Sequence, residues 1–497
     1  MKFLMYYIHI MSLNVIRKIR ELIALALLFI FSLISFVNPG KLAYAQSISA
    51  TPSIISSIAG NNNDLSSPPS PTIAANPNEQ IELVNNGYLI HTNKGVVYSG
   101  SANILIGTTG TYTSDPQVIW DASSNKFYFS YYEVVNGQNG IVWGFSKTAN
   151  PTGPKNFCTY YNTFNYGSTT FPDRQNLGDT KDFLLISSNR YFTSNYGLDG
   201  SDIAWIAKPL SVTTTTCPTA SSLSSGIQAL KNPDGVTSPW LPTSSKQVDA
   251  NSTGYIIGVP NYVSGNTLTE YSVTKNIING SAIIGKATSI PIVAYSYPPN
   301  VPQKGTTLTG AQAPLLQTQT YLTSSIMAYD PRLGHNTIWT AQTVAGGAGS
   351  QVQWYEINPS ASVIDQTGTI TDSTLNIFNP TISPDRIVIG AKSGFGSSAI
   401  INVSTSSNSS YPSIAITSTV NGQLTSPLLT IKQSTGPNID FSCVTSCRYG
   451  DYSGAVPNPA APLTGTHGQV FMSNQWNNTS INDNTPIWQT LISLISF

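Results

Sequence analysis

Ser70-Pro-Thr-Ile-Ala-Ala-Asn-Pro77 and Ser114-Asp-Pro-Gln-Val-Ile-Trp-Asp121 are two instances of one phrase, in which Pro or Asp-Pro opens a short run of strand-forming residues. The phrase returns in residues 326–331 (IMAYDP) and 379–385 (NPTISPD). Each time, a polar turn and a second strand-forming run follow. Self-similarity at intervals of tens of residues is typical of repeat proteins, and in a chain of strands and turns it predicts the blades of a β-propeller.

Strand-forming runs continue from residue 70 to the C-terminus without an amphipathic helical pattern of useful length. We therefore expect an all-β fold, a β-propeller domain over residues 70–497 with seven blades, six or eight being alternatives. The expected blades cover residues 70–110, 112–152, 170–212, 244–285, 318–360, 372–410 and 436–493. The polar stretches 213–243 and 286–317 are expected as long loops on one rim. Two or three consecutive β-sandwiches are the other architecture that fits the pattern.

Residues 1–45 have the order of a signal peptide. Basic residues precede an apolar run over residues 22–37, and Ala43-Tyr44-Ala45 offers the small residues that a signal peptidase accepts. The run is short for a bilayer span, which takes roughly 20 residues, and an uncleaved anchor is the alternative. Residues 46–69 then form a linker or a strand that closes the last blade. The protein is expected to be secreted or at the cell surface, with no membrane span after cleavage.

The net charge of the chain argues against nucleic acid as a partner. Residues 1–45 carry five of the 23 Lys and Arg and one of the 23 Asp and Glu, so the remaining chain has 18 bases, 22 acids and a formal charge of −4. Without a basic block, nucleic-acid binding has no electrostatic support. Charged residues make up only 9% of the chain, so hydroxyl and amide groups must cover the surface. Such a surface suits a glycan or a surface protein as partner.

Four cysteines follow the signal segment: Cys158, Cys217, Cys443 and Cys447. An even number in an exported chain favours disulfides. Chain order suggests the pairs Cys158–Cys217 and Cys443–Cys447, one of three pairings. A metal site on Cys-x-x-x-Cys is the alternative for the second pair, although two further ligands are not nearby in sequence.

Acidic residues recur near the expected blade openings, where the innermost strands meet the central channel. Most of them suit turns, because Asp caps its own backbone and Asp-Pro opens turns readily. Acids near Asp115 and Asp121 are the alternative ligands for a Ca²⁺ ion. Asp179, Asp182 and Asp451 have polar, glycine-containing surroundings, and we retain them as catalytic candidates for paired-carboxylate chemistry.

The densest segment is residues 443–454, in which a cysteine pair, a cation, two tyrosines and an acid lie within twelve residues. Arg448 joins the catalytic candidates there. Tyr449, Tyr452 and the later Trp476 are candidate ligand-binding aromatics. Residues 448–453 (RYGDYS) resemble the Arg-Trp-Gly-Asp-Tyr-Ser run in the C-terminal blade of secreted sialidase-like (BNR-type) β-propellers. The openings of the first two blades are also similar to that group, whose members are mostly undefined in function.

Sialidase activity itself does not follow from this resemblance. Sialidases use three arginines to hold a carboxylate, and only five arginines follow the signal segment here. The aspartate box of those enzymes is absent, and the nearest stretch, residues 121–127, lacks its glycine and spacing. The sequence also contains no nucleophile elbow, P-loop or dinucleotide-binding glycine motif, and the remaining histidines have no ligand spacing.

Two functions of different classes fit these observations. The first is a binding module without enzymatic activity, which recognises a glycan or a protein through one rim. The second is a carbohydrate-active enzyme, a glycoside hydrolase or a lyase, with its site at the channel mouth. A convergent pair of carboxylates with an arginine in one pocket would favour the enzyme. A self-associating coat component is a third hypothesis. No cofactor is expected apart from the Ca²⁺ alternative.

Overall fold

The computed structural model describes residues 49, 51–62, 66–107, 110–209, 216–478 and 487–497. These residues form a β-propeller of seven blades, as the repeated phrase predicts. The predicted signal peptide lies outside the described residues. In the described part of the chain, no helix has the length and apolar character needed to cross a bilayer.

Each blade is built around antiparallel strands, and apart from the added strands of blades 4, 5 and 7 these follow one another in chain order across the sheet. Blade 1 consists of β2 (Thr72–Ala75), β3 (Glu79–Val84), β4 (Gly87–Thr92) and β5 (Gly95–Ser101). Blade 2 consists of β6 (Tyr112–Asp121), β7 (Lys126–Val135), β8 (Gln138–Ser146) and β9 (Phe157–Gly167). Blade 3 consists of β10 (Thr170–Asp179), β11 (Phe183–Phe192), β12 (Leu198–Ala207) and β13 (Ser225–Leu230). Three short helices, α2 (Ala102–Ile106), η1 (Pro154–Asn156) and η2 (Ala220–Ser222), lie in the connections.

Blades 4 to 6 carry additional strands. Blade 4 consists of β14 (Trp240–Ser244), β16 (Gly254–Val259) and β17 (Ser264–Lys275), with β18 (Ala282–Ile284) and β19 (Thr288–Ser296) both paired to β17. Blade 5 consists of β20 (Leu322–Asp330), β21 (His335–Gly346), β22 (Gly349–Asn358) and β23 (Val363–Ile370), with β15 (Lys246–Gln247) parallel to β20. Blade 6 consists of β24 (Asn376–Pro384), β27 (Ala399–Ser407), β28 (Ser410–Thr419) and β29 (Leu429–Gln433). A small hairpin of β25 (Ile387–Ile389) and β26 (Lys392–Gly394) projects from blade 6.

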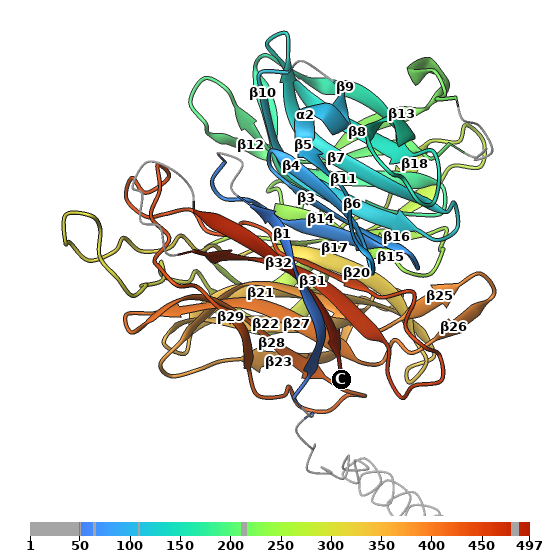
Figure 1. Cartoon of the computed structure of the whole chain (residues 1–497). Helices are drawn as coiled ribbons and strands as arrows, with labels where there is room; N and C mark the ends of the chain where they lie inside the picture. Colours follow the sequence, from blue (N-terminus) through green and yellow to red (C-terminus); the bar gives the residue numbers. More distant parts are fainter. Residues whose placement is uncertain (1–48, 50, 63–65, 108–109, 210–215, 479–486) are drawn as a thin grey trace, which may run out of the picture. The chain divides into compact units, whose positions relative to one another are not determined.

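Blade 7 is completed by the N-terminal segment. It contains β30 (Gly454–Pro457), β31 (Gln469–Asn477) and β32 (Trp488–Ser496), and β1 (Ser53–Asn62) pairs antiparallel with β32 as the outermost strand. The first and last described strands therefore lie side by side, β1 in blue and β32 in red in Figure 1. Glu82 on β3 of blade 1 accepts hydrogen bonds from Asn61 and Thr490, which joins the two ends of the ring.

The stretches predicted as long loops are partly strand. Residues 225–230 of the first stretch form β13, and residues 288–296 of the second form β19. Blade 2 also continues past its expected end at residue 152, because β9 forms its outer edge. These loop predictions were wrong because both strands lie within stretches rich in Ser, Thr and Pro and are mostly exposed, with one buried residue in β13 and two in β19. Their sequences therefore read as loops.

The core is divided into packed layers between neighbouring blades. Because side chains alternate across a strand, each inner strand supplies one layer on each side. Val118 packs toward blade 1, whereas Ile119 packs toward blade 3. The layer between blades 7 and 1 contains Ile73 and Val456, so the packing continues around the ring. Both faces of the inner strands are buried, which explains the nearly continuous runs of apolar residues.

Candidate functional site at the upper channel mouth

A β-bulge recurs near the start of the innermost strands. The pairing register shifts after Ser114 in β6, Asp173 in β10 and Phe378 in β24, among others. In six of the seven blades a non-glycine residue at this position has a positive φ, and these residues are Ser70, Asp115, Arg174, Leu241, Asn379 and Asp451. We call this end of the channel the upper mouth, and the end at which the inner strands finish the lower mouth.

The bulge explains the repeated phrase. Ser70-Pro71, Asp115-Pro116 and Asn379-Pro380 occupy equivalent positions at the upper mouth. Asp and Asn tolerate the left-handed conformation better than most residues, and proline needs no ladder hydrogen bond at a bulge. The phrase at residues 326–331 differs, because its Asp330-Pro331 lies in the turn after β20, at the lower mouth.

An ionic cluster lies where blades 2, 3 and 7 meet at this mouth. Arg174 Nη2 contacts Asp451 Oδ1 at 3.1 Å, and Arg448 Nη2 contacts the other oxygen, Oδ2. The backbone N–H of Arg174 donates to Asp115 Oδ2 at 3.0 Å. The Arg174 guanidinium lies 4.9 Å from the ring centre of Tyr321. The cluster therefore brings together the predicted residues Asp115, Arg448 and Asp451.

The carboxyl groups of this cluster titrate differently. Burial opposes ionisation of Asp451, but the charges of Arg174 and Arg448 outweigh it and hold the pKa of Asp451 below its usual range. Burial, followed by the nearby charge of Asp173, raises the pKa of Asp115 to about 7. Burial also raises the pKa of Asp173, although both arginines oppose the change. Near neutral pH the cluster thus holds one fixed carboxylate, Asp451, and one carboxyl group, Asp115, that readily exchanges its proton.

A polar pocket of about 330 Å³ opens beside this cluster. Asp115, Asp173 and Arg448 contribute the charged groups of its lining. Hydroxyl and amide side chains supply most of the remainder: Ser66, Ser67, Asn85, Asn86, Asn103, Thr111, Thr113 and Ser114. Two aromatic rings, Tyr112 and Phe441, complete the wall. The pocket therefore satisfies the criterion of two carboxylates and an arginine in one place.

Unpaired polar atoms continue from the cluster into the channel. Within the described residues, Arg174 Nη1 and both polar atoms of the Gln175 side chain are buried without a hydrogen-bond partner. The hydroxyl groups of Thr72 and Thr243, also on innermost strands, are in the same state. Buried polar groups are nearly always satisfied, so this channel suits water or polar ligand groups rather than apolar ones.

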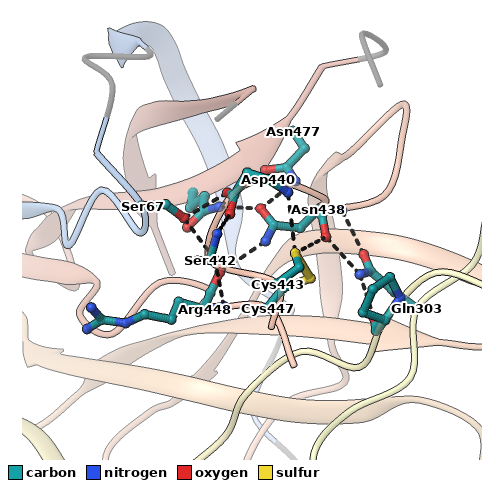
Figure 2. Close-up of a disulfide and its surroundings, with 11 residues drawn as sticks. Ser67, Gln303, Asn438, Asp440, Ser442, Cys443, Cys447, Arg448 and Asn477 are labelled. Carbon is teal, nitrogen blue, oxygen red and sulfur yellow. Dashed lines mark hydrogen bonds between the residues drawn. A yellow bond between two sulfur atoms is a disulfide. The ribbon is translucent and has the colours of Figure 1, made fainter. Parts of the chain in front are cut away.

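A disulfide loop holds Arg448 in place (Figure 2). Both predicted disulfides, Cys158–Cys217 and Cys443–Cys447, are present. Beside the second, the backbone N–H of Arg448 donates to Ser442 Oγ at 3.1 Å, and Asn438 Nδ2 donates to the carbonyl of Arg448 at 3.0 Å. Figure 2 shows the Arg448 side chain extending away from this network. Because its backbone is fixed at both ends, the guanidinium is presented from a rigid support.

The other predicted acids lie at the lower mouth. Lys208 Nζ bridges Asp121 Oδ2 at 2.8 Å and Asp179 Oδ2 at 2.7 Å, which clamps blade 2 to blade 3. Burial raises the pKa of Asp179 to about 6 against the opposing charge of Lys208. Asp182 forms a more exposed pair with Lys275. Asp179 and Asp182 are therefore not part of the upper pocket, and their contacts are those of structural ion pairs.

A shared Ca²⁺ site for Asp115 and Asp121 does not fit the geometry. They lie near opposite ends of β6, six residues or about 20 Å apart along the strand. Since Ca²⁺–oxygen distances are about 2.3–2.6 Å, one ion cannot contact both. No group of three or more His, Cys, Asp or Glu among the described residues is arranged to hold a metal ion.

The predicted ligand-binding aromatics are largely buried. Tyr449 and Tyr452 are 1% and 2% exposed, and their hydroxyl groups donate to backbone carbonyls of Gln475 and Gln175. Trp476 is half-buried, with Lys432 Nζ 3.9 Å from its ring centre. Tyr449 and Tyr452 therefore support the mouth and present no ring face to a ligand from solvent.

Two residues of the site, Asp173 and Arg174, were not selected from the sequence. They precede Gln175 and lack the proline that follows Ser70, Asp115, Leu241 and Asn379. Aligning residues 173–177 with residues 114–118 would have placed them at the upper mouth. Tyr321 carries no comparable signal, because it reaches the cluster from the segment before β20 through its contact with the Asp451 carbonyl.

Comparisons with known proteins found similar solved structures but no sequence relative. Neither a family model nor a curated protein sequence matches the chain. Solved structures similar to it include the NanB sialidase from Streptococcus pneumoniae, with 8% identity, a TM-score of 0.39 and coverage of 84% of this chain and 83% of that one. Another is a subtype N10 neuraminidase-like protein of A/little yellow-shouldered bat/Guatemala, with 10% identity, a TM-score of 0.34 and coverage of 89% of this chain and 99% of that one. Similarity at this level carries no argument about activity.

Proposed function

We propose that this protein is an exported β-propeller that recognises a glycan in the polar pocket at its upper mouth. The observation that carries the proposal is the pocket lining, in which hydroxyl and amide side chains surround two carboxyls and one arginine. Hydroxyl and amide groups both donate and accept, as sugar hydroxyl groups do. The signal-like N-terminus and the two disulfides support export from the cytoplasm.

The charge balance of the site favours a neutral sugar. Asp451 already pairs with both arginines, so neither guanidinium is left without a counter-ion. If Asp115 and Asp173 share one proton, the five charged groups of the cluster sum to zero. An anionic ligand would have to compete with Asp451 for Arg448, whereas a neutral sugar only has to replace water.

A second candidate function, glycoside hydrolysis, is favoured by Asp115 and Asp173 in the same pocket. Glycosidases commonly use one carboxyl group as an acid and a second as a base or nucleophile. Asp115, with a pKa of about 7, is suited to donate a proton to the leaving glycosidic oxygen. Asp173, half-buried and facing the pocket, is suited to act on water or on the sugar. In this reaction a C–O bond breaks and water adds across it.

The test begins with binding of the purified protein to a broad glycan array, with and without Ca²⁺. We expect specific binding of one sugar class, and Asp173→Asn should weaken it at least about fivefold. Asp372, half-buried in the connection between β23 and β24, is changed to Asn as the control. An array without binding in either condition would overturn glycan recognition.

The bound sugar then separates binding from hydrolysis, because only an enzyme releases shorter products. Under the hydrolase hypothesis, Asp115→Asn lowers turnover by about 10²-fold or more, the usual contribution of a general acid. Product release is followed by anion-exchange chromatography. Tight binding with no product over a day leaves the protein a binding module.

A further inference from the structure

A continuous series of aromatic rings extends from the polar pocket across blades 2 and 3. Tyr112 and Tyr132 have ring centres 5.8 Å apart, and Tyr132 and Phe171 6.2 Å apart. Phe171 then contacts Tyr191 at 5.7 Å and Tyr196 at 6.1 Å. We call these five residues the aromatic track. All of them belong to the upper-mouth ends of their strands or to the β11–β12 turn.

The track begins in the pocket and ends on an exposed turn. Tyr112 lines the pocket and is 55% exposed, whereas Tyr196 at the far end is 77% exposed. Phe171 and Tyr191 are half-buried between them, and Tyr132 is the buried floor. Exposed aromatic rings at both ends of a connected row of aromatic side chains indicate a contact surface.

The surroundings of the track exclude a phosphate-bearing partner. Arg190, next to Tyr191, is neutralised by Asp199 and Asp202 at 2.5 and 2.8 Å. Asp173, at the pocket end, is acidic. Single-stranded nucleic acids also stack on aromatic rings, but they need uncompensated cations along the backbone. A neutral chain with hydroxyl groups and C–H faces, which pack on the electron-rich faces of aromatic rings, has no such requirement.

We propose that the aromatic track binds an extended neutral oligosaccharide whose end occupies the pocket. This rests on the proposed glycan recognition and adds the substrate class, a chain of several sugars rather than a single residue. Continuity decides the choice, because Tyr112 belongs both to the pocket wall and to the track. A chain that fills the pocket therefore emerges directly onto Tyr112, Phe171 and Tyr196.

Isothermal titration of the purified protein with oligosaccharide ladders tests this inference. The probes are manno-, xylo-, galacto-, cello- and chito-oligosaccharides of one to six residues. We expect affinity to rise about tenfold or more between one and six residues. Tyr196→Ala should lower the affinity for the hexamer about fivefold and leave that for the shortest binding sugar unchanged. Tyr196→Phe keeps the ring and should restore hexamer binding.

Tyr262→Ala is the matched control. Tyr262 is 46% exposed and lies in the equivalent turn of blade 4, where it contacts Trp240 and Tyr297 instead of the track. Equal affinity for short and long sugars, or equal losses in the Tyr196 and Tyr262 variants, would overturn the track and leave pocket recognition standing. Absence of binding across all ladders would overturn both.

Discussion

Asp115 and Asp451 both have a positive φ at the upper mouth, yet the pKa of Asp115 is raised and that of Asp451 is lowered. Asp451 faces two guanidinium groups, whereas Asp115 faces Asp173 and receives a backbone N–H. The same backbone position thus carries carboxyl groups with different pKa values, because different side chains surround it in different blades. The same principle separates acid from base in enzymes with paired carboxylates.

Stability should fall as pH rises from about 4 to about 7. Burial raises the pKa of Asp115 to about 7 and that of Asp179 to about 6, so both carboxyls bind protons more readily in the folded than in the unfolded chain. Their stabilising effect is complete below the unfolded pKa and is lost as pH rises through the folded pKa. Asp115→Asn, which stays neutral, should recover on the order of 2 kcal/mol at pH 8 and change little at pH 4.

Denaturant unfolding of both proteins at pH 4, 6 and 8 measures the effect. Burial opposes ionisation of Asp121, but the charge of Lys208 outweighs it and lowers the pKa of Asp121. The effect of Asp121 on stability therefore changes at lower pH than the range of this experiment. A stability difference between Asp115→Asn and the parent protein that is the same at all three pH values would contradict the assignment.

At the scale of elements, the bulged strands are connected by side chains of the preceding blade. Asn85 Oδ1 accepts from the N–H of Asp115 at 2.9 Å, and Asn189 Oδ1 accepts from that of Leu241, also at 2.9 Å. Thr343 Oγ1 accepts from the N–H of Asn379 at 3.0 Å. Each bulge would otherwise leave a buried donor unpaired, so neighbouring blades fix one another's geometry at the upper mouth.

The two disulfides should contribute unequally to the free energy of unfolding. Cys158–Cys217 spans 59 residues and links β9 to the segment before β13, whereas Cys443–Cys447 spans four. Loop-closure entropy predicts losses of about 4 kcal/mol for the first pair and about 2 kcal/mol for the second when both cysteines become serine. Guanidinium unfolding of the two double variants gives the comparison. A larger loss for the short loop would show that its role in supporting Arg448 exceeds chain entropy.

The sequence predicted the blades and both disulfides, but fewer of the residues that form the site. Repeated bulges place proline at fixed points, so Pro71, Pro116 and Pro380 revealed the blades. The cysteine pairs followed from chain order. In contrast, Arg174 of blade 3 reaches Asp451 of blade 7 only because the ring closes, which no local pattern encodes. Tyr449 and Tyr452 were expected at a binding surface, but composition alone does not tell which face of a loop is buried.

On the scale of the whole molecule, blade 7 depends on a strand from the other end of the chain. Deleting residues 53–62 exposes the edge of β32 and removes the Asn61 contacts of Glu82. We expect a fall in Tm of at least about 5 °C and self-association through the open edge. Calorimetry and size-exclusion chromatography with light scattering measure both.

A peptide of residues 53–62 added in trans should pair with β32 and raise the Tm of the truncated protein. The same peptide with Ser57→Pro is the control, because proline cannot donate to the ladder. An unchanged Tm on truncation would show that the layers between blades hold the ring without its closing strand.

The separation of these strands also sets the order of assembly. Ser57 and Ser493 share a hydrogen bond across 436 residues of sequence. At typical synthesis rates, β1 therefore waits roughly 20–90 s for its partner strand. During that time its backbone is an unpaired edge, the kind that recruits other chains. Six of the ten residues of β1 are serine, glycine or asparagine, and most of its residues stay exposed after folding. A strand that gains little from burial can remain soluble until the last blade is made.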